Sequence, residues 1–226
     1  MDELEKKLGF AFKDQDLLKE ALTHRSYLNE NPNWGLPHNE RLEYLGDAVL
    51  ELAVTEDLYT RFPEYPEGQL TVLRAALVNY QMLSTVASEL ELQKFIFMSR
   101  GERADGGRAK EVILANALEA LIGAVYLDKG FEEARQFTHR FVLKHLSEIL
   151  ENKSYRDSKS ELQELIQEKL RVTPTYKVIH ETGPAHKRIF TIAVYFGDDM
   201  IAEGKGLSKQ DAEVEAARAA LRKYQK

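Results

Sequence analysis

The segment HNERLEYLGDA, residues 38–48, carries three carboxylates at spacings of three and four. On a helix, at about 100° per residue, Glu43 lies about 60° from Glu40, and Asp47 returns to within about 20° of Glu40. Like charges this close repel one another unless solvent or a cation separates them, and a hard divalent cation such as Mg²⁺ prefers oxygen ligands. The spacing therefore indicates a metal site, and the ordinary alternative is a solvated helix face.

The rest of this helix pattern favours the metal site. Gly46 lies mid-helix beside Asp47, where it costs up to about 1 kcal/mol relative to alanine, and a close backbone approach by another element or by a ligand would explain it. Apolar residues surround most of the helix, so Glu43 and Asp47 are expected to flank a packed face. These apolar residues are Leu42, Tyr44, Leu45, Ala48, Val49 and Leu52.

The hydrophobic period changes along the chain and predicts two domains. The first reads as helices over 14–24, 40–61, 67–90 with a candidate break at Asn79, 110–127 and 131–151. The second reads as a helix over 158–170, strands over 176–182, 188–196 and 200–206, and a helix over 208–224. We therefore expect an all-α domain over 1–151, a linker over 152–157 and a small α+β domain, α-β-β-β-α, over 158–226.

Charge is unevenly divided between these parts. The whole chain holds 31 Lys and Arg against 37 Asp and Glu, of which residues 156–226 contribute 13 and 11. An acidic first part repels phosphate unless metal ions intervene, whereas a mildly basic second part can hold a polyanion unaided. The chain has no cysteine, which excludes disulfides and thiolate zinc sites. Its charged N-terminal residues and the lack of a long apolar run predict a soluble, cytoplasmic protein without a membrane partner.

Three motifs resemble those of the ribonuclease III family of double-stranded RNA endonucleases. ERLEYLGDA, residues 40–48, is similar to the family signature, and ILANALEALIGAVYLD, residues 113–128, is similar to its second metal-bearing helix. LTHRSY, residues 22–27, is similar to the N-terminal motif of the family. The resemblance extends over essentially the whole chain and makes the solvated-face alternative much weaker.

The resemblance implies a set of acidic site residues in the first domain. The implied metal ligands are Glu43, Asp47, Asn116 and Glu119, with Asp47 and Glu119 carrying most of the catalysis. Glu40, Glu67 and Glu102 match acidic positions that line the cleavage valley, although Glu67 also fits an ordinary helix start. The family more often has Asp where this chain has Asn116. An amide oxygen can still ligate Mg²⁺, but it brings no charge.

The second domain resembles the double-stranded RNA-binding domain. Its first helix places short and amide side chains on one face, as suits the shallow minor groove of A-form RNA. The loop GPAHK resembles the one that enters a second minor groove, and the last helix begins with groups that can face phosphates, although Gln210 stands where the family usually has a second lysine. The implied RNA-binding residues are Ser160, Gln163, Gln167, His186, Lys187, Lys205, Ser208, Lys209 and Gln210.

The resemblance implies Mg²⁺-dependent hydrolysis of double-stranded RNA, with Mn²⁺ able to substitute. The products would carry 5′-phosphate and 3′-hydroxyl ends with short 3′ overhangs, as in processing of rRNA precursors and other structured transcripts. A homodimer through the catalytic domain is implied, although the apolar helix residues could equally fill a monomer core. No nucleotide cofactor is expected. Two alternatives keep the fold: a regulator that binds duplex RNA without cutting it, and a structural ribonucleoprotein subunit.

Overall fold

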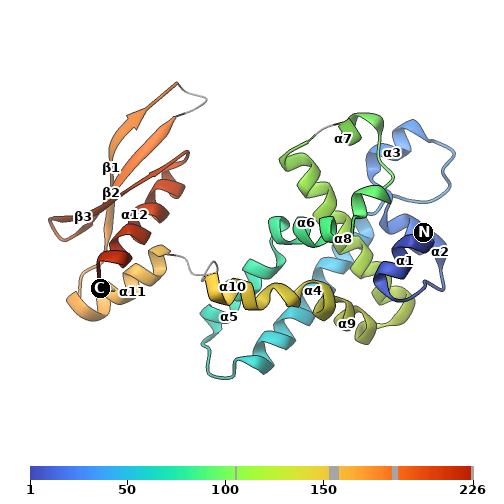
Figure 1. Cartoon of the computed structure of the whole chain (residues 1–226), viewed down its shortest axis with the longest axis horizontal. Helices are drawn as coiled ribbons and strands as arrows, with labels where there is room; N and C mark the ends of the chain where they lie inside the picture. The colour runs from blue at the N-terminus through green and yellow to red at the C-terminus, as the bar shows by residue number, and fades with distance from the viewer. Residues whose placement is uncertain (105, 153–157, 185–187, 225–226) are drawn as a thin grey trace. The chain divides into compact units, whose positions relative to one another are not determined.

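The computed structural model describes residues 1–104, 106–152, 158–184 and 188–224 (Figure 1). Backbone contacts divide the chain into two compact units, Met1–Tyr155 and Arg156–Lys226. Most of the predicted linker, residues 153–157, lies outside the described residues. None of the helices in the described part is long and apolar enough to cross a membrane.

The first unit is helical, as predicted. Asn79 does separate two helices: its side-chain oxygen accepts a hydrogen bond from the Met82 N–H at 2.9 Å and so caps the second. The helix expected over 131–151 is broken by a short 3₁₀ turn. The elements are α1 (Asp2–Leu8), α2 (Gln15–Ala21), α3 (Arg25–Glu30), α4 (Glu40–Arg61), α5 (Glu67–Val78), α6 (Tyr80–Glu89), η1 (Leu92–Lys94), α7 (Arg100–Ala104), α8 (Arg108–Lys129), α9 (Phe131–Phe141), η2 (Leu143–His145) and α10 (Leu146–Asn152).

Helix α8 forms the centre of this unit and packs along α4. Between Ile113 and Val125 every residue of α8 is buried except Asn116 and Glu119, which are half-buried. A helix that is apolar all round belongs in a core. The buried neighbours on α8 therefore hold Asn116 and Glu119 in place.

Two glycines let the α4 and α8 backbones approach each other closely. A Cβ on Gly46 would overlap the carbonyl oxygen of Glu119 and lie 2.9 Å from the backbone nitrogen of Gly123. A Cβ on Gly123 would in turn overlap the carbonyl oxygen of Leu42. Of the two explanations for Gly46, close approach by another element is the one the structure confirms.

One expectation for α4 is wrong in the single chain. Leu42 and Val49 are buried, but Tyr44 is 84% exposed and Leu52 is 56% exposed. Ala48 is also exposed. These three residues lie on a side of α4 that the described elements of the unit leave exposed. Helical periodicity alone does not distinguish a face that packs in the core from a face that packs against another molecule.

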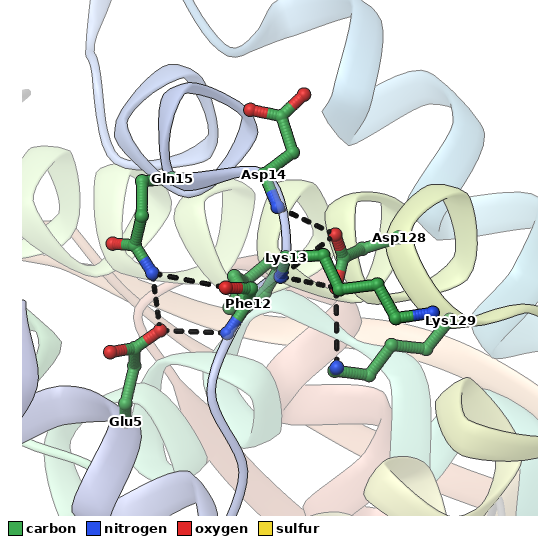
Figure 2. Close-up of polar contacts among 7 residues, drawn as sticks. All are labelled: Glu5, Phe12, Lys13, Asp14, Gln15, Asp128 and Lys129. Atoms are coloured by element: carbon green, nitrogen blue, oxygen red, sulfur yellow. Dashed lines mark hydrogen bonds and ion pairs between the residues drawn. The ribbon is translucent and has the colours of Figure 1, made fainter.

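Two carboxylates fasten the connection between α1 and α2 to the rest of the unit (Figure 2). The Asp128 side chain, 2% exposed, accepts hydrogen bonds from the Lys13 and Asp14 backbone N–H groups, the latter at 2.9 Å. Burial works to raise the pKa of Asp128, but these N–H donors outweigh it and hold that pKa below its ordinary value. Glu5 accepts from the Phe12 N–H at 2.7 Å in the same way. The end of α8 is thus tied to the start of α2.

The second unit has the predicted order α-β-β-β-α. Its strands form an antiparallel sheet in the order β1-β2-β3, and alternate residues of β2 such as Val194 and Phe196 pack with the two helices. Gly204 lets α12 lie directly on β3, since a Cβ there would overlap the Ala216 backbone nitrogen. The elements are α11 (Ser158–Leu170), β1 (Thr175–Thr182), β2 (Ile189–Phe196), β3 (Asp199–Gly206) and α12 (Lys209–Tyr224).

We expect Gly46→Ala to destabilise the first unit by about 2–3 kcal/mol or more, because the added methyl group meets rigid backbone rather than a flexible side chain. Thermal and chemical unfolding followed by circular dichroism measures this. Gly68→Ala is the matched control, since nothing lies within 4 Å of a Cβ there. Gly68 is also helical, so the control should change stability by less than about 1 kcal/mol. Equal effects of the two substitutions would contradict the close crossing.

Candidate active site

The crossing of α4 and α8 brings the predicted metal ligands together. Asp47 follows Gly46, which faces the Glu119 backbone, so these two carboxylates flank the crossing point. Glu43 lies one turn earlier on α4, and the Asn116 side chain, one turn before Glu119, hydrogen-bonds to it. The four side chains come from two helices whose backbones cannot slide apart without losing the glycine contact.

Burial and like charge act together on these acids. Burial, followed by the charges of Asp47 and Glu43, raises the pKa of Glu119 to about 8. Burial and the Glu40 charge also raise the pKa of Glu43, against the opposing hydrogen bond from Asn116. Acids that are costly to ionise side by side are stabilised in their charged form by a cation. The electrostatics of the crossing therefore suit a divalent ion.

The donor set fits Mg²⁺ by its chemistry, since it offers carboxylate and amide oxygens and neither sulfur nor imidazole. As the side chains stand, however, no group of three or more His, Cys, Asp or Glu among the described residues converges closely enough to hold a metal ion. Asn116 would add an amide oxygen to the carboxylates.

Glu40 is the first residue of α4, and Glu102 lies in α7. Glu40 pairs with Arg25 at 3.3 Å and with His38 at 3.8 Å, and its charge acts on Glu43. The charges of Glu102 and Glu40 both act on the His24 ring. Both acids are therefore within electrostatic range of His24, and their role in the cleavage valley remains a prediction.

Glu67 is the first residue of α5 and is exposed. Its Oε1 accepts a hydrogen bond from the Thr71 hydroxyl at 2.9 Å, within the same helix. This contact suits an ordinary helix start. A valley role for Glu67 remains a prediction.

In the second unit, Ser160, Gln163 and Gln167 are exposed along one face of α11. Their exposure is consistent with contacts to the minor groove of RNA and equally with an ordinary solvent-exposed helix face. Residues 185–187, which include the predicted contacts His186 and Lys187, lie outside the described residues. These positions stay predictions.

The residues around the start of α12 are exposed, but two of them have structural contacts. Ser208 caps the helix: its hydroxyl donates to the Asp211 carboxylate at 2.7 Å and accepts from the Asp211 N–H at 3.1 Å. The Lys209 ammonium lies 5.7 Å from the centre of the Phe190 ring. Lys205 and Gln210 are exposed beside them. The helix start therefore presents basic and amide groups on a fixed backbone.

The residues of the sequence motif LTHRSY make contacts that connect α3 to the segment before α7. The Ser26 hydroxyl of α3 accepts a hydrogen bond from the Ser99 N–H at 3.0 Å, directly before α7. Neither α3 nor α7 was expected from the sequence. Helices of six and five residues show too little periodicity to be detected by pattern.

Comparisons with known proteins agree with this organisation. Residues 14–146 match the family model described as ribonuclease-III-like, and residues 158–224 match the double-stranded RNA binding motif. The first match covers more than half of the chain. The chain belongs to the ribonuclease III family.

Full-length relatives and a solved structure support the same conclusion. Ribonuclease 3 of a Nitratiruptor species is 44% identical over 222 residues, which span 98% of this chain and 96% of that protein. Ribonuclease 3 of Pelotomaculum thermopropionicum is 46% identical over 220 residues, 97% of this chain and 91% of that protein. A structure of the nuclease domain of ribonuclease III from Campylobacter jejuni is 46% identical, with a TM-score of 0.58, over 63% of this chain and 96% of that domain. The protein is a double-stranded RNA endonuclease of the ribonuclease III type.

The Glu119 environment predicts a pH effect on the metal-free protein. Its pKa rises from 4.5 to about 8 on folding, so its neutral form favours the folded state below pH 4.5, and that contribution is lost as pH rises through 8. With a metal chelator present, Glu119→Gln should therefore be more stable than the native chain at pH 8, by on the order of 2 kcal/mol. At pH 4 the substitution should bring no such gain in stability. Chemical unfolding across this range measures the difference.

The control is Glu111→Gln, which changes an exposed glutamate of the same helix. Its unfolding free energy should run parallel to that of the native chain from pH 4 to pH 8. A parallel profile for Glu119→Gln would show that Glu119 is not held in a strained, charged environment.

Proposed function

We propose that this chain hydrolyses double-stranded RNA with Mg²⁺ bound at the crossing of α4 and α8, with Mn²⁺ able to substitute. The carrying observation is that acids on opposite helices repel one another at this crossing, where partial burial and the charges of Asp47 and Glu43 raise the pKa of the half-buried Glu119 to about 8. A protein that merely bound RNA would gain nothing from this arrangement. We assign Glu43, Asp47, Asn116 and Glu119 as ligands, with Asp47 and Glu119 as the catalytic pair.

In this proposal the protein contributes position and charge. When bound, divalent ions activate a water, shield the scissile phosphate and stabilise the departing 3′ oxygen, which leaves 5′-phosphate and 3′-hydroxyl ends. Asp47 and Glu119 hold opposite sides of the crossing at a fixed separation because Gly46 locks the two backbones. Asn116 fixes the orientation of Glu43 through their hydrogen bond. Glu40, Glu102 and Glu67 line the approach to the site.

We propose that two chains pair through the exposed face of α4. Tyr44, Leu52 and Tyr59 lie within about 80° of one another around the helix and are 84%, 56% and 73% exposed. Large apolar side chains gathered in this way mark an interaction surface. Because Tyr44 and Asp47 share this helix, pairing there brings two metal sites to one valley. The related Campylobacter jejuni nuclease domain is described as having a region involved in dimer formation.

The double-stranded RNA-binding motif over 158–224 supplies duplex binding, and we propose that its contacts come from two faces. Ser160, Gln163 and Gln167 would lie in a minor groove. Lys205, Ser208, Lys209 and Gln210 would face phosphates, and the predicted loop residues His186 and Lys187 would reach a second minor groove. This unit carries the positive charge that the nuclease unit lacks.

Removing the catalytic carboxylate should separate cutting from binding. Glu119→Gln is expected to lower the cleavage rate by a factor of about 100 or more while leaving duplex affinity nearly unchanged. A cleavage assay with and without Mg²⁺, run beside a gel shift, measures both. Glu111→Gln is the control and should cleave normally. If Glu119→Gln retained more than about a tenth of the native rate, the assignment would fail, and a native chain inactive at every Mg²⁺ concentration would favour the binding-only alternative.

Restoring charge at position 116 should strengthen ion binding. Asn116→Asp adds one negative charge where the geometry is already set, so the Mg²⁺ concentration for half-maximal cleavage should fall. A Mg²⁺ titration of single-turnover cleavage measures this midpoint. An unchanged midpoint would mean that Asn116 only orients Glu43 and does not ligate the ion.

Charge on the proposed pairing face should prevent dimer formation. Leu52→Lys is expected to give a monomer in sedimentation velocity at micromolar concentration, because an ammonium in an apolar interface is costly to desolvate. Leu170→Lys changes a leucine of similar exposure in the second unit and should leave the dimer intact. A dimer that persists in Leu52→Lys would place the interface elsewhere.

A further inference from the structure

Helix α3 holds the first turn of α7 through side-chain contacts to backbone N–H groups. The Ser26 hydroxyl accepts from the Ser99 N–H at 3.0 Å, and the Glu30 carboxylate accepts from the Arg100 N–H at 3.3 Å. The Ser99 hydroxyl then accepts from the Glu102 N–H, also at 3.3 Å. The position of Glu102 is thus set by α3, seventy residues or more earlier in the chain.

His24 extends this chain of hydrogen bonds. Its Nδ1 lies 2.8 Å from the Ser26 hydroxyl and accepts from the Ser26 N–H at 3.3 Å. Because Nδ1 accepts from the Ser26 backbone N–H, it carries no proton, so the ring proton belongs on Nε2 and the Ser26 hydroxyl can donate to Nδ1. Burial holds the pKa of His24 below its ordinary value, with Glu102 opposing, so the ring is a neutral donor.

The same segment also fixes the start of α4. The Thr23 carbonyl accepts from the Asn39 N–H at 2.9 Å, and Asn39 is the buried residue directly before Glu40. On the other side, the His24 N–H donates to the Phe97 carbonyl at 2.9 Å. The segment from Thr23 to Ser26 therefore lies between the two elements that carry Glu40 and Glu102, and the charges of both acids act on the His24 ring.

We propose that His24 and Ser26 are positioning residues that set where the Glu102 carboxylate lies beside Glu40 at the edge of the cleavage valley. This inference rests on the valley role given to Glu102 in the proposed function. The Ser26 and Ser99 contacts fix the backbone at Glu102, and a neutral His24 ring does not cancel the charge of the carboxylate, which an arginine or a protonated histidine would do. The valley keeps its negative potential while its acids are fixed in place.

A double-mutant cycle between Ser26 and Glu102 tests the proposal. Ser26→Ala removes the hydroxyl that links His24 to the Ser99 N–H. It is expected to lower the turnover number for duplex RNA about tenfold, with KM changed by less than about twofold. Ser26→Thr keeps the hydroxyl and should restore most of the activity. In the Glu102→Gln background, Ser26→Ala should have no further effect. Ser147→Ala, an exposed serine of α10, is the control.

A second readout does not depend on activity. Nitrogen NMR of histidine-labelled protein should show His24 with its proton on Nε2 in the native chain, and also in Ser26→Ala and Ser26→Thr, because the backbone N–H of residue 26 still donates to Nδ1. Thermal unfolding identifies any variant that fails to fold. If Ser26→Ala does not fold, Ser99→Ala, which removes only the hydroxyl that accepts from Glu102, replaces it in the same cycle.

The outcomes separate this inference from the function on which it rests. If Glu102→Gln cleaves like the native enzyme, the valley role of Glu102 fails and the inference fails with it. If Glu102→Gln is impaired but Ser26→Ala is as active as the native chain, or if the two effects multiply, the inference alone is overturned. A His24 proton found on Nδ1 in the native chain would also overturn it.

Discussion

The contact between Gly46 and the backbone of α8 is the constraint on which the site depends. Two helices normally stay apart by the thickness of their side chains, but here neither helix has a side chain at the crossing. The backbone approach leaves Asp47 and Glu119 on the two sides of one point, and it explains why a mid-helix glycine is kept despite its cost. The acids are held close together by packing, against their own repulsion.

This placement works because α8 is otherwise buried. Its apolar residues on all sides fix the helix in the core, so Asn116 and Glu119 have little freedom to retreat into solvent. The energy that raises the pKa of Glu119 is supplied by the packing of the whole unit. The second unit needs no such arrangement, since its mildly basic chain can meet a polyanion directly. Cutting and holding the duplex are thereby divided between two independently packed cores.

The long elements were predictable because their signals are local. The bounds of α4 agree residue by residue with the expected helix, and the α-β-β-β-α order follows from the change of period. The pattern does not predict helices α1, α3 and α7, because each is only five to seven residues long and α3 and α7 are held by contacts distant in sequence. The Ser26 hydroxyl, for instance, meets a backbone seventy-three residues away.

The sequence predicts which residues form the candidate site, but it does not predict how they are arranged. Spacing put Glu43 and Asp47 on one face, yet only the fold shows Asn116 hydrogen-bonded to Glu43. The prediction that Tyr44 and Leu52 are packed was wrong for the single chain, since both are exposed. An apolar residue in a helical pattern does not show whether it packs within its own chain or against another molecule. The contacts of Ser208 likewise give it a capping role that the family pattern alone did not show.

Anomalous X-ray scattering from crystals grown with Mn²⁺ tests the central claim most directly, because it locates the ion without any assay of activity. The account predicts a peak at the α4–α8 crossing, within ligand distance of Asp47 and Glu119, and its loss in crystals of Glu119→Gln. An ion bound elsewhere in a protein that cleaves duplex RNA under the same conditions, with the crossing unliganded, would contradict it.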